Sequence, residues 1–83
     1  MISTNYAIYK KEDQEIFIKD INKLRLDNKN KWLFLRCEFD NKHIEIKLYN
    51  TWLQVYKVDG INYSNCMDRN IKQFKDDLAR GIR

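Results

Sequence analysis

The sequence contains no proline, and only two glycines, two cysteines and one histidine occur among its 83 residues. No stretch approaches the roughly eighteen consecutive apolar residues of a membrane span, and the first residues lack the apolar run of a signal peptide. One histidine cannot complete a zinc site with two separated cysteines, Cys37 and Cys66. We therefore expect no metal, no cofactor and no membrane association, and we expect a cytoplasmic location, which is the host cytoplasm if a phage encodes the chain.

The short length limits the kind of site that the chain can build. A domain of this size buries only about 60% of the surface that its unfolded chain exposes, so an enclosed catalytic cavity is hard to form. Gly60 in a predicted turn and Gly81 after a predicted helix leave no glycine for a phosphate-binding loop. No catalytic motif is present, and these features predict a non-enzymatic protein that binds at its outer surface.

The excess of positive over negative charge is small, because 16 basic and 12 acidic residues leave a net charge of only +4. A mildly basic protein is attracted to nucleic acid, anionic lipid or an acidic protein. Proteins that imitate DNA are strongly acidic, so the positive net charge makes DNA mimicry a disfavoured function for this chain. The absence of proline together with many asparagines and lysines suggests an AT-rich source such as a phage or mobile element.

Two segments show helical periodicity. Between Glu12 and Leu26, apolar residues recur at helical spacing at Ile16, Phe17, Ile21 and Leu24. A second stripe follows a cap at Ser64 or Asn65 and consists of Met67, Ile71, Phe74, Leu78 and Ile82. Gly81 lies where a helix commonly ends in a residue with positive φ. The sequence therefore predicts one helix on each side of a central segment.

The central segment alternates between apolar and polar residues, as strands do. We expect strands at residues 31–40, 43–49, 52–58 and 61–63. A turn at Asn41 and Lys42 would pair Phe39 with Ile44, Cys37 with Ile46 and Leu35 with Leu48. Asp59-Gly60 indicates a type I′ hairpin before the short last strand.

These elements predict an α+β fold with the order αβββ(β)α in one small domain, residues 1–83. We expect an antiparallel sheet of three to four strands with both helices packed on one face, which leaves the other face open. Residues 1–11, and Tyr6 to Tyr9 in particular, could add an edge strand or form an arm on the domain.

The third strand has two possible registers. A two-residue turn at Asn50 and Thr51 pairs Leu48 with Leu53; it turns Leu53 and Val55 inward, but also Lys57 and Asn62. A three-residue turn that includes Trp52 pairs Tyr49 with Leu53, turns Tyr56, Val58, Ile61 and Tyr63 inward, and sets Glu45 opposite Lys57. We prefer the second register, because burying an unpaired Lys57 would cost several kcal/mol.

The best candidate site is an aromatic and basic patch on the open face. In either register Phe34 would lie across from Tyr49, with Arg36 and Lys47 paired in the next row, and Trp52 beside them. The candidate partner-binding residues are Trp32, Phe34, Arg36, Lys47, Tyr49 and Trp52. Rings and cations of this kind form both protein hot spots and platforms for single-stranded nucleic acid.

Two other candidates are weaker. His43 beside Asp40 and Glu45 lies at an expected hairpin tip, where no pocket would exclude water. Cys66 at the expected start of the second helix could have a lowered thiol pKa, but no base is identifiable near it. We expect a solvated histidine and an inert thiol.

The element order is similar to that of the double-stranded-RNA-binding domain. That family has a lysine-rich motif at its second helix, where this chain has "NCMDRN" (residues 65–70), so the family's phosphate contacts do not carry over. In size, composition and lack of catalytic motifs the chain resembles small phage inhibitors of host defence or host enzymes. We expect an inhibitor or adaptor that occludes a host protein; the alternatives are RNA or single-stranded DNA binding, and a homodimer through the same face.

Overall fold

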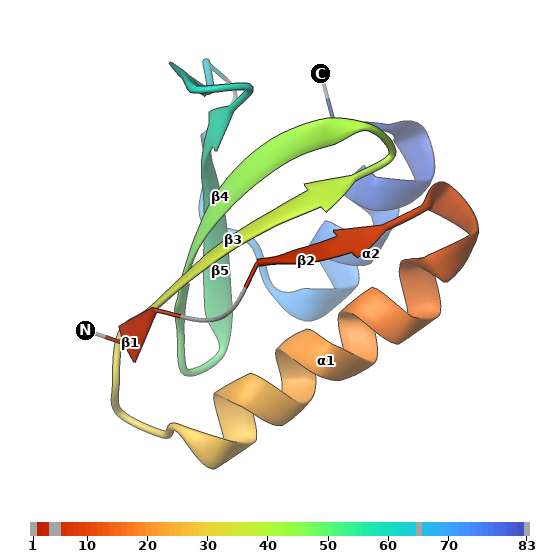
Figure 1. The fold of residues 1–83 in the computed structure, drawn as a ribbon. Coiled ribbons are helices and arrows are strands. Elements are labelled where there is room, and N and C mark those ends of the chain that lie inside the picture. Colours follow the sequence, from red (N-terminus) through yellow and green to blue (C-terminus); the bar gives the residue numbers. More distant parts are fainter. Residues whose placement is uncertain (1, 4–5, 65, 83) are drawn as a thin grey trace.

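The computed structural model describes residues 2–3, 6–64 and 66–82, which form one α+β domain (Figure 1). The helical segments are η1 (Lys11–Asp13), α1 (Gln14–Asp27) and α2 (Ile71–Arg80). The strands are β1 (Ile2–Ser3), β2 (Ala7–Tyr9), β3 (Leu33–Phe39), β4 (Lys42–Tyr49), β5 (Trp52–Val58) and β6 (Ile61–Asn62).

The sheet is larger than we predicted and it is mixed. Strands β3 to β6 form an antiparallel meander, as expected, while β1 and β2 both pair with β3 in the parallel direction. The expected edge strand at Tyr6 to Tyr9 therefore exists as β2. Parallel neighbours need a crossover connection, and α1 supplies it between β2 and β3. Runs of two and three residues are too short to show a strand periodicity, so the sequence could not predict the parallel edge.

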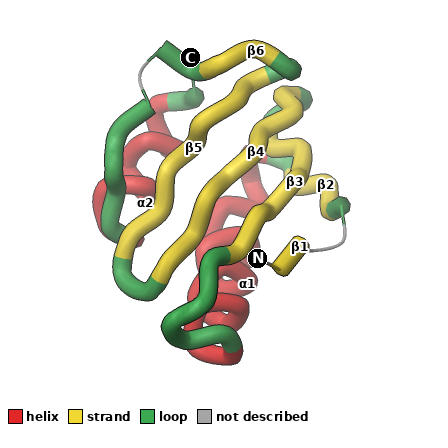
Figure 2. Tube along the Cα trace, turned by 90° about the vertical axis from the view of Figure 1, so that its left-hand side faces the viewer, coloured by secondary structure: helices red, strands yellow, loops and turns green. Residues whose placement is uncertain are grey.

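Both helices pack on one face of the sheet, as predicted. Figure 2 shows the sheet in front of α1 and α2, with no described element over its near face. The core lies between these layers and takes its largest fully buried side chains from both of them: Phe17, Ile21, Leu33, Ile44, Ile46, Leu48, Leu53, Phe74 and Leu78. In α1 the buried stripe runs through Phe17, Ile18 and Ile21, whereas Ile16 is exposed, contrary to the prediction.

The turn between β3 and β4 lies one residue earlier than predicted. Asp40 and Asn41 form it, with φ angles of 51° and 66°. Asn and Asp tolerate positive φ far better than Lys does, which is why Lys42 stays outside the turn. The pairs are consequently Leu35 with Ile46 and Cys37 with Ile44, so the predicted pairing is wrong by two residues. A shift of two keeps every side chain on its predicted face.

The β4–β5 hairpin follows both of the alternative registers, one at each end. Its turn has two residues and pairs Leu48 with Leu53, so the preferred three-residue turn is wrong. Farther along, the register shifts between Glu45 and Ile46, and Glu45 lies opposite Lys57 as the preferred register required. One extra residue, Tyr56, makes this β-bulge and keeps Lys57 out of the core.

The two-residue turn and the bulge together decide which way the last residues of β5 and the residues of β6 point. Val58 and Tyr63 pack against the core, as predicted, but Tyr56 lies on the open face. Ile61 is also not inward, because 72% of it is exposed at the short hairpin. The Tyr56 carbonyl accepts a hydrogen bond from the Tyr63 amide at 2.9 Å, which ties the end of β6 to the bulge.

Helix α2 begins later than predicted. Its cap is Asn70, whose side chain accepts a hydrogen bond from the Gln73 amide at 2.8 Å, while the Gln73 side chain bonds the Asn70 amide. Ser64 is therefore not the cap, and the alternative at Asn65 lies outside the described residues. Instead of starting a helix, Arg69 pairs its backbone with Leu53 on β5, and Met67 is 54% exposed rather than buried. Gly81 has φ of 90°, the expected positive value.

Two weakly acidic side chains, the buried Cys37 and the partly buried Tyr9, predict a loss of stability at alkaline pH. Burial raises the pKa of the Cys37 thiol from 9.0 to about 12. Burial and the hydrogen bond that the Tyr9 hydroxyl donates to Asp20 raise the pKa of Tyr9. Since the folded chain holds these protons more tightly than the unfolded chain, their contribution is complete below about pH 9 and is lost as pH rises toward 12.

The free energy of unfolding, measured by urea titration between pH 7 and 11, should therefore fall above about pH 9. The double variant Cys37→Val and Tyr9→Phe lacks both groups and should lose less stability over the same range. An equal loss in the two proteins would show that these protons do not control the alkaline limit.

Candidate site on the open sheet face

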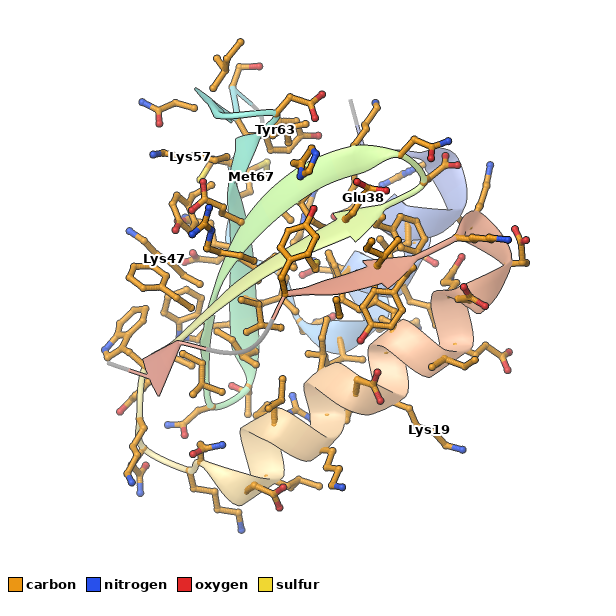
Figure 3. All side chains as sticks on the ribbon, in the orientation of Figure 1. Lys19, Glu38, Lys47, Lys57, Tyr63 and Met67 are labelled. Atoms are coloured by element: carbon orange, nitrogen blue, oxygen red, sulfur yellow. The ribbon has the colours of Figure 1, made fainter. Side chains whose placement is uncertain are left out.

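The structure places all six candidate residues at the face of the sheet that the helices do not cover. We call this surface the open face. Its side chains alternate with the buried ones along β3, β4 and β5, and in Figure 3 the labelled Lys47 and Lys57 point away from the helical layer. Trp32 directly precedes β3 and is 41% exposed. A partner could therefore reach this surface without moving a helix.

Three rings form a compact group at the end of the open face near the β4–β5 turn. We call Trp32, Tyr49 and Trp52 the aromatic cluster. Trp32 stacks on Tyr49 with 4.9 Å between ring centroids and meets Trp52 edge-on at 5.1 Å. Each ring limits the movement of the others, so the cluster presents a pre-ordered apolar surface whose side-chain entropy is already partly lost.

Tyr56 extends the aromatic surface, and the sequence interpretation missed it. Its ring lies 5.6 Å from the ring of Phe34, and the Lys47 amine sits 5.0 Å from its centroid. Strict alternation from either turn length could not place Tyr56 and Lys57 on the same face, because only a bulge does so. No residue near the bulge predicts it from its type. The one indication in the sequence is that strict alternation after a two-residue turn would bury Lys57.

The corrected register changes the rows of the open face. Phe34 lies opposite Lys47, not Tyr49, and Arg36 lies opposite Glu45, not Lys47. The Arg36 guanidinium is 3.8 Å from the Glu45 carboxylate, which also accepts a hydrogen bond from Tyr56 at 3.3 Å. Arg36 and Lys47 thus occupy different rows, each with its own neighbour, and the open face carries charges of both signs.

The other end of the open face is polar. His43 shares a 2.5 Å hydrogen bond with the Tyr6 hydroxyl, and its second ring nitrogen lies 3.5 Å from Glu38. The His43 side chain is 64% exposed, as expected for a hairpin tip. Burial and the Glu38 charge raise the pKa of Tyr6, while burial and Glu45 raise that of Tyr56. Both phenols therefore remain neutral hydrogen-bonding groups.

The N-terminal segment does not lie over the aromatic cluster in the part of the chain that the structure describes. Strand β2 lies in the plane of the sheet beside β3, with Ala7 opposite Cys37 and Tyr9 opposite Phe39. Tyr9 turns to the helical side, where it stacks on Phe17 at 4.5 Å. At the polar end of the open face, Ile8 lies opposite Glu38 and is 66% exposed, and the ring of Tyr6 lies 5.8 Å from that of His43.

The cysteines offer no reactive site that the structure supports. Cys37 is buried in the core, and burial raises the pKa of its thiol. Cys66 is a half-buried free thiol, but α2 begins only at Ile71, so the expected position at a helix N-terminus is wrong. Among the described residues, no group of three or more His, Cys, Asp or Glu side chains could hold a metal ion.

Comparisons with protein-family models, with curated proteins and with solved structures find no match for this chain. Neither helix of the described chain has the length and apolar character needed to cross a membrane.

Proposed function

We propose that the protein is a non-enzymatic binding module that occludes a host protein through the open face, as a small inhibitor or adaptor encoded by a phage or mobile element. The aromatic cluster and Phe34 enter an apolar depression of the partner, while Arg36 and Lys47 meet acidic groups at its rim. The observation that carries the proposal is the aromatic cluster, which remains at the surface of a sheet face that no described helix or strand covers.

The packing of the rings favours a protein partner over nucleic acid. Platforms for single strands present ring faces on which successive bases stack. Here Trp32 and Tyr49 stack on each other, so one face of each ring is already used. Glu38 and Glu45 on the same surface would repel phosphates, and Arg36 is already near one of these carboxylates. Mixed charge around a central aromatic group is the pattern of a protein hot spot.

A salt titration of the purified complex tests the proposal. The tagged protein captures its partner from source cells, with and without nuclease treatment, and mass spectrometry identifies what is retained. With the purified partner, we expect affinity to change less than about tenfold between 50 and 200 mM salt, whereas binding through several phosphates falls by about 1,000-fold or more. Capture that disappears after nuclease treatment, with steep salt dependence, would establish nucleic acid binding instead.

A further inference from the structure

Most of the net positive charge of the chain lies in one short segment, residues 23–31, where α1 ends. Between Lys23 and Lys31 the sequence "KLRLDNKNK" has four basic residues and one acidic residue, whereas the whole chain has a net charge of only +4. This segment contains the end of α1 and the loop that leads to β3. The remainder of the surface is consequently close to neutral.

The loop and the aromatic cluster lie at the same end of the sheet. The Asn30 amide donates a hydrogen bond to the Asn50 side chain at 3.0 Å, which joins the loop to the β4–β5 turn. Trp32 follows the loop and Trp52 follows the turn, and Figure 1 shows the loop beside the turn at the lower end of the molecule. A partner that covers the cluster is therefore close to the basic loop.

A hollow of about 450 Å³ separates the end of α1 from the turn. Its lining residues are Arg25, Leu26, Lys29, Asn30, Asn50 and Thr51. Leu26 is 60% exposed at this hollow, an apolar side chain between cationic ones. No ion pair engages Lys29 or Lys31 within the described part of the chain, so their charges are available to a ligand.

We infer that the partner contact continues from the aromatic cluster into this hollow, and that the segment of the partner protein that enters it is acidic and carries an apolar residue. This inference rests on the proposed function. We call Arg25, Lys29 and Lys31 the basic end. The carboxylates of the segment meet the basic end while its apolar side chain covers Leu26, which complements both the charge and the exposed apolar surface. The hollow itself has no aromatic lining on which a base could stack, which favours the acidic protein segment over a nucleic acid strand.

The test uses a short fluorescein-labelled peptide of glutamates with interspersed leucines as the probe. A peptide with lysine in place of glutamate and a short oligouridylate serve as comparison probes. We expect the glutamate peptide to bind and to shift the amide NMR signals of residues 25–31 and 49–52. Lys29→Glu with Lys31→Glu should weaken it at least about tenfold, since each reversal replaces an attraction with a repulsion. Lys72→Glu with Lys75→Glu, the same charge change on exposed positions of α2, should leave affinity within about twofold.

The outcomes separate this inference from the function on which it rests. Equal weakening by the two charge reversals would overturn the basic end as a specific contact, and so would tighter binding of oligouridylate than of the glutamate peptide. Absence of peptide binding at the basic end would overturn the inference as well. None of these results would contradict the proposed function, in which a captured protein contacts the aromatic cluster. Substitution of the two tryptophans tests that contact separately.

Discussion

Replacement of Trp32 and Trp52 by alanine should weaken binding of the captured partner by at least about 100-fold. Buried aromatic anchors at interface centres each contribute about 2 kcal/mol or more on truncation, and every 1.4 kcal/mol is tenfold in affinity. The two substitutions also remove the edge-on contact between the indoles, so Tyr49 loses both of its aromatic neighbours. Isothermal titration with the purified partner measures the loss.

A matched control separates the open face from exposed apolar surface in general. Ile16 on α1 and Ile61 on β6 are 56% and 72% exposed, and neither belongs to the aromatic cluster. The double variant Ile16→Ala and Ile61→Ala should bind within about twofold of the natural sequence, because its residues lie outside the proposed contact. Circular dichroism should show that both double variants are folded. If the tryptophan variant is folded and binds normally, the open face is not the binding surface.

The largest expected effect on stability comes from Phe74→Ala. Phe74 is fully buried on α2 and meets the ring of Phe17 on α1 edge-on at 5.8 Å, so it joins the two helices beneath the sheet. Truncation of a buried phenylalanine costs about 3 to 5 kcal/mol, from lost transfer energy and the cavity that remains. Because native proteins have only about 5 to 15 kcal/mol in total, this loss removes a large part of the stability of the domain, and urea titration should show a much lower free energy of unfolding.

The same substitution at Phe34 is the control for this prediction. Phe34 lies on the open face and is only half-buried, so Phe34→Ala leaves no enclosed cavity. Urea titration should give a loss of about 1 kcal/mol or less for Phe34→Ala. Comparable losses for the two variants would mean that the open face is covered in solution, as in a homodimer through that face.

The faces of the central strands were predictable, although their pairing was not. Alternation along β3 and β4 assigned Leu35, Cys37, Ile44 and Ile46 to the core, and all four are buried. Alternation has a period of two, so it cannot detect a register error of two residues. The observed turn uses Asp40 and Asn41 in place of the predicted Asn41 and Lys42. Both turn positions have positive φ, which Lys42 would not readily adopt.

Other features depended on interactions that sequence patterns do not contain. The two-residue turn points Tyr56 to the open face, and the bulge then reverses the alternation, which is why Lys57 also points outward while Val58 packs on the core. Met67 fits the helical stripe of α2, yet the backbone of Arg69 pairs with Leu53 and the helix begins only at Ile71. In both cases tertiary contacts overrode a local pattern.

Hydroxyl-radical footprinting of the complex tests the open face most directly. Oxidation of each side chain is measured by mass spectrometry with the partner absent and present. We predict that Trp32, Tyr49 and Trp52 lose most of their reactivity in the complex, whereas exposed Met67, which lies outside the open face, keeps it. Unchanged oxidation of the three rings together with protection of Met67 would contradict the account and place the binding surface elsewhere.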